Sequence, residues 1–119
     1  METNLFINMK QLKFAEPLLK LVLSGVKTST WRINDTRDIV EGDELSLCFV
    51  DGVEYAKAVV TKVKITSFGE LTDEDKVGHE SFRSDEEMYE TYSRYYKLLV
   101  TSDTELKIIW FELLENYNN

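Results

Sequence analysis

The chain has 119 residues and a mass of 13.9 kDa, which fits a single domain over 1–119, since one core spans about 100 to 150 residues. Hydrophobic residues make up 43% and charged residues 30%, the balance of a globular chain rather than a disordered one. No apolar run approaches the ~20 residues of a membrane helix, and the N-terminus does not read as a secretory signal. We therefore expect a soluble, cytoplasmic protein with no membrane partner.

The net charge of -8 is unevenly distributed. Residues 1–70 carry ten acidic and nine basic residues, whereas 71–119 carry twelve acidic and five basic residues. Tight binding to a long polyanion such as DNA requires an excess of basic residues that neutralise its phosphates. Because this chain has an excess of acidic residues, we expect no DNA partner. A nucleic-acid ligand would need a local site in the N-terminal half, or would be as small as a nucleoside.

Cys48 and His79 are the only cysteine and the only histidine. A single cysteine permits neither an internal disulfide nor a cysteine zinc cluster, and a single histidine excludes a site with two histidine ligands. We expect no metal and no cofactor. Cys48, in a hydrophobic segment, is predicted to lie in the core.

The patterning predicts a strand at 10–14, followed by a helix that opens at Ala15-Glu16-Pro17 and closes at Gly25. β-Branched and aromatic residues predict a strand at 28–33. Strands at 44–50 and about 53–66 flank the hairpin turn Asp51-Gly52.

Beyond the hairpin, the apolar parity switches within the second of these strands, which predicts a bulge or bend. Capping-box patterns at Thr72 and Ser84 predict helices near 73–78 and 85–97. The segment 105–113 is apolar on both parities and is predicted to be a central strand. The predicted fold class is therefore α+β, with a curved, mostly antiparallel sheet that we expect to form a barrel.

The segment GVKTSTWR (residues 25–32) contains a G-x-K-x-x-x-x-R element and precedes Glu41-Gly42-Asp43 and a hydrophobic strand. Together with TSFGELT (66–72), GHESF (78–82) and KIIWF (107–111), it resembles the ASCH domain family of the PUA-like superfamily. The resemblance runs from about Leu12 to Leu113. It implies a small PUA-like β-barrel with two to three flanking helices and a cleft between barrel and helices.

Such domains are generally thought to bind RNA or modified nucleosides, and some compact bacterial members are amidohydrolases that deacetylate N4-acetylcytidine. Their catalytic lysine and threonine match Lys27 and Thr30, and their glutamate most nearly matches Glu80. In this reading Lys27, Thr30 and Glu80 are catalytic.

The chemistry of an amidohydrolase can also be assembled from the residue types present. Amide hydrolysis needs an activated nucleophile, a proton donor for the amine and a group that stabilises the oxyanion. Burial and a nearby cation would lower the pKa of Lys27, so that it could serve as a base. Arg32 would hold an oxyanion or a phosphate, and Ser29, Trp31 and Arg32 are the candidate substrate-binding residues. In a regular strand Lys27 has the opposite parity to Thr30, so the site requires Lys27 to lie in the turn after Gly25.

Structural roles are the alternatives. Lys27 could be a cation at a helix C-terminus, and Arg32 could pair with Asp35. Glu80 could be a solvated carboxylate, Thr30 and Trp31 ordinary strand and core residues, and His79 a hydrogen-bonding residue. The predicted helix near 85–97 carries an apolar and aromatic face that would pack on the core, formed by Met88, Tyr89, Tyr92, Tyr95 and Tyr96. Its tyrosines could alternatively stack on a base.

Two functions follow: a hydrolase of an acylated nucleoside or similar small amide, or a non-catalytic RNA-binding module. An adaptor with an idle site is a third option. The sequence leaves the oligomeric state, the natural substrate and the choice of nucleophile open.

Overall fold

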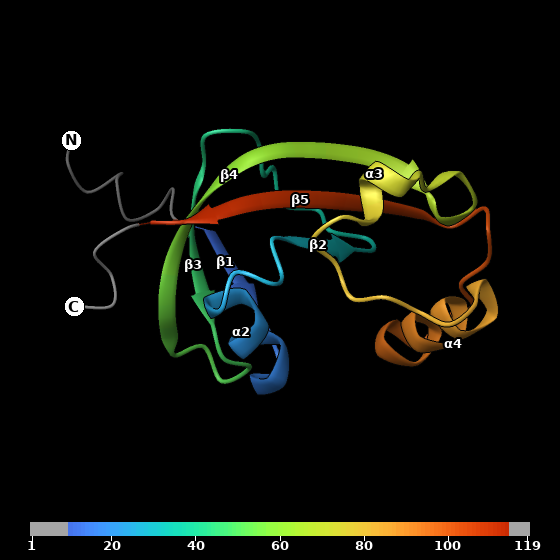
Figure 1. Ribbon diagram of the computed structural model, residues 1–119, viewed down its shortest axis with the longest axis horizontal. Helices are drawn as coiled ribbons and strands as arrows, with labels where there is room; N and C mark the ends of the chain where they lie inside the picture. Colours follow the sequence, from blue (N-terminus) through green and yellow to red (C-terminus); the bar gives the residue numbers. More distant parts are fainter. Residues whose placement is uncertain (1–9, 115–119) are drawn as a thin grey trace.

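The computed structural model describes residues 10–114, which form one curled sheet with helices packed against it (Figure 1). In chain order the elements are β1 (Lys10–Lys13), α2 (Glu16–Leu23), β2 (Ser29–Arg32), β3 (Glu44–Cys48), β4 (Glu54–Ser67), a 3-10 turn (Phe68–Glu70), α3 (Asp73–Lys76), α4 (Asp85–Tyr96) and β5 (Glu105–Leu113). Each strand and helix expected from the sequence is present. The 3-10 turn was not expected.

The sheet has five strands in the order β1-β3-β4-β5-β2. Three of the four pairings are antiparallel, and only β1 lies parallel to β3. The expected bend in the long strand is confirmed, because the register of β4 against β5 shifts between Val60 and Lys62. Bulges of this kind increase the local twist and let a sheet curl.

The curled sheet forms a half-barrel and not a closed barrel, because β1 and β2 remain as its two edges. Side chains bridge these edges. Arg32 of β2 donates to the carbonyl oxygen of Lys13 in β1 at 3.2 Å, and Arg37 donates to the carbonyl oxygen of Gln11. The opening between β1 and β2 is thus bridged by cationic side chains and not by a strand ladder.

Strand β5 separates two hydrophobic clusters, as the apolar residues on both of its faces predict. Ile109 and Phe111 pack in the cluster beneath α2, whereas Leu106 and Ile108 pack in the cluster beneath α4. Burying a side chain of this size contributes about 1.5 to 3 kcal/mol. Cys48 is buried, as expected. Helix α2 and helix α4 therefore lie at opposite ends of the half-barrel, with β2 between them (Figure 1).

Of the helices in residues 10–114, none has the length and apolar character needed to cross a membrane.

Candidate functional site

Lys27 lies in the turn between α2 and β2, where the sequence required it to be. Gly25 ends the helix with a φ of 86°, and the backbone N–H of Lys27 donates to the carbonyl oxygen of Leu21 at 3.0 Å. A glycine is favoured at this position because side chains clash in the left-handed region. The turn sends the Lys27 side chain inward, and only 3% of this residue is exposed.

Glu80 is the partner of this buried lysine. The Lys27 Nζ and the Glu80 Oε2 are 2.5 Å apart, and 28% of the Glu80 side chain remains exposed. The two residues are 53 positions apart in the chain. The structure thus brings together two of the three residues predicted to be catalytic.

Burial and charge set the protonation of the pair. Burial lowers the pKa of Lys27 below its usual value; Glu80 opposes this shift and Arg32 adds to it. Burial would raise the pKa of Glu80, but its contacts with His79 and Lys27 outweigh that effect and lower it. A lysine whose ammonium is destabilised, in contact with a carboxylate that can exchange a proton with it, is suited to acid–base chemistry.

His79 is buried against the indole of Trp31, with ring centroids 3.8 Å apart and planes 11° from parallel. Its Nδ1 lies 3.0 Å from the carbonyl oxygen of Glu80, and its Nε2 lies 3.0 Å from the Tyr92 hydroxyl. A carbonyl can only accept, so Nδ1 carries the hydrogen and Nε2 accepts from Tyr92. Burial and, next, the charge of Lys27 lower the pKa of His79 to about 4. The ring is therefore neutral near pH 7 and holds the Glu80 backbone in place.

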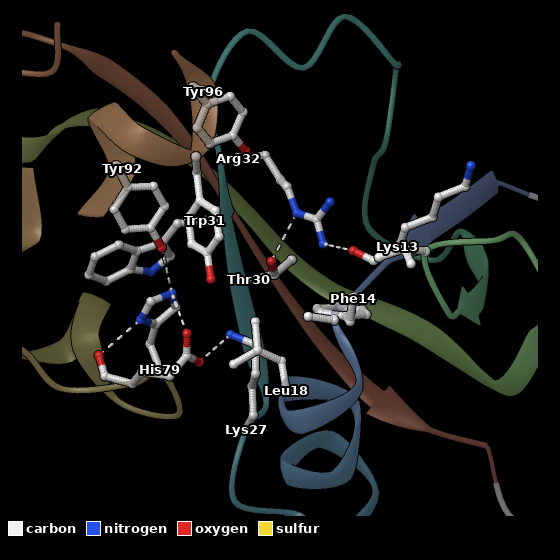
Figure 2. Close-up of a pocket in the computed structure, with 14 residues that line it drawn as sticks. Lys13, Phe14, Leu18, Lys27, Thr30, Trp31, Arg32, His79, Tyr92 and Tyr96 are labelled. Carbon is white, nitrogen blue, oxygen red and sulfur yellow. Dashed lines mark hydrogen bonds and ion pairs between the residues drawn. The ribbon is translucent and has the colours of Figure 1, made fainter. Parts of the chain in front are cut away.

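Thr30 and Arg32 share one face of β2, as their spacing predicts. The Arg32 Nε donates to the Thr30 Oγ1 at 2.9 Å, and the guanidinium lies 5.0 Å from the centroid of the Phe14 ring (Figure 2). The proposed pairing of Arg32 with Asp35 does not form, because Arg37 takes this carboxylate at 2.9 Å. Burial lowers the pKa of Arg32, which is the electrostatic cost of a guanidinium without a carboxylate partner.

These side chains surround a cavity of about 290 Å³. Its walls come from α2, β2, the loop before Ser81 and helix α4 (Figure 2). The lining residues are Lys13, Phe14, Ala15, Leu18, Lys27, Thr30, Trp31, Arg32, Val50, His79, Glu80, Tyr92, Tyr95 and Tyr96. An apolar and aromatic wall with a few convergent polar groups is typical of a small-molecule site.

Solved structures share this arrangement of elements. An ASCH domain from Lactobacillus crispatus JV V101 has a TM-score of 0.68 and 13% identity, over 89% of this chain and 79% of its own. A protein of Enterococcus faecalis V583 from the DUF984 family has a TM-score of 0.70 and 20% identity, over 93% and 84%. A mutant ASCH protein from Zymomonas mobilis has a TM-score of 0.61 and 14% identity, over 88% and 68%.

The chain has the ASCH-domain fold. The resemblance found in its sequence is thus confirmed for the fold. Neither a family model nor a curated protein matches the sequence. At these identities the roles of individual residues in this ASCH fold have to be argued from its own geometry.

Five of the six candidate site residues line the cavity: Lys27, Thr30, Trp31, Arg32 and Glu80. Ser29 does not line it. Its side chain is fully buried, and its Oγ makes no hydrogen bond within the described part of the chain. Trp31 has one ring face covered by His79, so its position is that of a wall residue within the core.

Sequence reasoning did not find Lys13 and Phe14 as site residues. Lys13 ends β1 and Phe14 follows it, and only the curling of the half-barrel brings them next to Arg32. The aromatic spacing in α4 was a usable signal. Met88 and Tyr92 are buried in the core, as a packing stripe predicts, while Tyr95 and Tyr96 lie at the cavity.

Proposed function

We propose that this ASCH-fold protein hydrolyses the acyl amide of a modified nucleoside, such as N4-acetylcytidine, in the cavity beside Lys27. The observation that carries the proposal is the Lys27–Glu80 contact of 2.5 Å, formed by an ammonium that is almost fully enclosed. An ion pair on the protein surface contributes little to folding stability, and it does not require an enclosed lysine. A destabilised ammonium at a cavity is instead typical of groups that transfer protons.

The residues supply each part of the reaction. The hydroxyl of Thr30, or a water in the cavity, attacks the acyl carbon while its proton passes to the Lys27–Glu80 pair. The Lys27 ammonium supports the oxyanion as the tetrahedral intermediate forms. The C–N bond then breaks, and the Lys27–Glu80 pair returns the proton to the departing amine. If Thr30 attacks, water hydrolyses the acyl-threonine and releases the carboxylic acid.

The direct test is incubation of the purified protein with N4-acetylcytidine, with cytidine and acetate as the products measured. Lys27→Ala and Glu80→Gln are each expected to lower kcat/KM by at least about 100-fold, the typical contribution of a positioned acid or base. Lys20→Ala removes an exposed lysine of α2 and is expected to leave turnover unchanged. No turnover by the folded wild-type protein would reject this substrate.

A second candidate is a non-catalytic RNA-binding module. The observation that favours it is the side chain of Tyr95, which lines the cavity although 64% of the residue is exposed, as a base-stacking ring would be. Arg32 would contact phosphate in this module, whereas Lys27 is already held by Glu80. Binding through several phosphates would weaken steeply as salt rises, and cleavage of a neutral nucleoside would hardly respond.

A further inference from the structure

The described part of the chain begins with a basic segment, although the protein is acidic. Residues 10–37 contain six lysines and arginines but only two acidic residues, Glu16 and Asp35. Four of these cations line a hollow next to the cavity, together with Gln11: Lys10, Lys13, Arg32 and Arg37. The hollow lies where the two edges of the half-barrel approach each other, and no acidic side chain lines it.

Two of the four cations are neutralised by carboxylates. Lys10 contacts Asp43 at 2.9 Å, and Arg37 contacts Asp35 at 2.9 Å. The other two cations, Lys13 and Arg32, form no ion pair with a carboxylate among residues 10–114. Within this range, the Arg32 side chain donates hydrogen bonds only to the Thr30 hydroxyl and to the carbonyl oxygen of Lys13. The hollow therefore carries about two uncompensated positive charges.

Arg32 is the more informative of the two. Arg32 is half-buried; its guanidinium lies over Phe14 and uses only part of its five donors. A charge that is partly withdrawn from water is costly unless an anion pairs with it. Arg32 and Lys13 also line both the hollow and the cavity, so an anion held by them would be attached to whatever occupies the cavity.

We propose that Lys13 and Arg32 form a phosphate subsite, so that the ligand of this protein is a nucleotide carrying a terminal phosphate rather than a free nucleoside. A phosphate monoester carries nearly two negative charges at pH 7, which matches the two unpaired cations. Its oxygens suit the planar fork of an arginine. The base and sugar occupy the cavity, and the phosphate occupies the hollow. Only the assignment of the base to the cavity rests on the proposed function.

The experiment compares binding of cytidine with binding of cytidine 5′-monophosphate by calorimetry at low salt. The monophosphate is expected to bind about tenfold more tightly or better, since a charged hydrogen-bonded pair contributes 1.5 to 3 kcal/mol. Lys13→Gln and Arg32→Gln are each expected to remove most of this advantage. Lys20→Gln, the matched control on α2, is expected to keep it.

Equal affinities for the two ligands, or no measurable binding of the monophosphate, would overturn the phosphate subsite. The readout does not depend on turnover, so a protein that binds the monophosphate tightly but hydrolyses nothing would reject the proposed hydrolase and keep the subsite. A further arm uses a 5′-phosphorylated RNA hexamer. Affinity equal to that of the monophosphate indicates a free nucleotide as the source of the phosphate, and much tighter, salt-sensitive binding indicates an RNA end.

Discussion

The carbonyl oxygen of Gly78 accepts the backbone N–H groups of Thr28 at 2.8 Å and of Ser29 at 3.2 Å. This contact attaches the loop that carries His79 and Glu80 to the start of β2, directly beside Lys27. The φ of Gly78 is 81°, and a Cβ at this position would lie 2.0 Å from the Thr28 Oγ1. The Gly78–Thr28 contact therefore joins the two halves of the candidate site through the backbone, beside the side-chain contact of Lys27 with Glu80.

Gly78→Ala is expected to destabilise the protein by at least about 2 kcal/mol, because it adds a steric clash to the cost of an unfavourable φ. Gly52→Ala is the matched control: its φ is 93°, but nothing lies within 4 Å of the added Cβ. Urea denaturation of both variants separates the two costs. Equal losses would show that the Thr28 side chain rotates away, or that the loop shifts, at little cost.

Removing the charge of Glu80 is expected to destabilise the protein by about 1 to 3 kcal/mol, a smaller loss than for a fully buried pair because Glu80 is partly exposed. The physical reason is that Lys27 would remain enclosed without a counter-charge. The measurement is a double-mutant cycle with Glu80→Gln, Lys27→Met and the double variant. The double variant is expected to be more stable than Glu80→Gln alone. Simple additivity of the two losses would contradict the coupling.

The pKa of His79 predicts a loss of stability in mild acid. Its folded value of about 4 lies below the ordinary 6.5, so between these values the unfolded chain binds a proton that the folded protein does not. The contribution of neutral His79 to the free energy of unfolding is therefore fully present above pH 6.5. It is lost as the pH is lowered toward 4, by about 3 kcal/mol at most.

Because His79 is the only histidine, its imidazole signal can be followed without ambiguity by NMR. We expect a midpoint near pH 4. A midpoint near 6.5 would mean that the ring is solvated and does not pack on Trp31. In the variant His79→Gln, the decline in unfolding free energy between pH 6.5 and 4.5 is expected to be shallower.

Tyr92→Phe is expected to cost about 1 to 2 kcal/mol, because it leaves the Nε2 of a buried His79 without its donor. Tyr95→Phe removes a hydroxyl that makes no hydrogen bond with any described residue, from a tyrosine that is mostly exposed, and is expected to change stability by less than about 0.5 kcal/mol. Thermal unfolding of the two variants gives the comparison. A similar loss in both would show that the His79–Tyr92 hydrogen bond does not contribute.

Local signals in the sequence predicted most of the elements. Pro17 and Gly25 bound a helix because one lacks an N–H and the other tolerates a positive φ. Thr72 forms the expected capping box with Asp75, whereas Ser84 forms only half of one, because Glu87 accepts from the backbone of Arg83 instead. The Glu87 carboxylate thus accepts from the N–H of Arg83, which lies outside the capping-box pattern, and not from the N–H of Ser84.

Some features of the candidate site likewise follow from local sequence, and others depend on the tertiary structure. The position of Lys27 after Gly25, and the shared face of Thr30 and Arg32, follow from turn chemistry and the period of a strand, so the sequence by itself determined them. The tertiary structure alone decided that Lys27 meets Glu80 and that Lys13 and Phe14 reach Arg32. The reason is that propensity and periodicity act over a few neighbouring residues, whereas these contacts depend on how far the whole sheet curls before its edges approach.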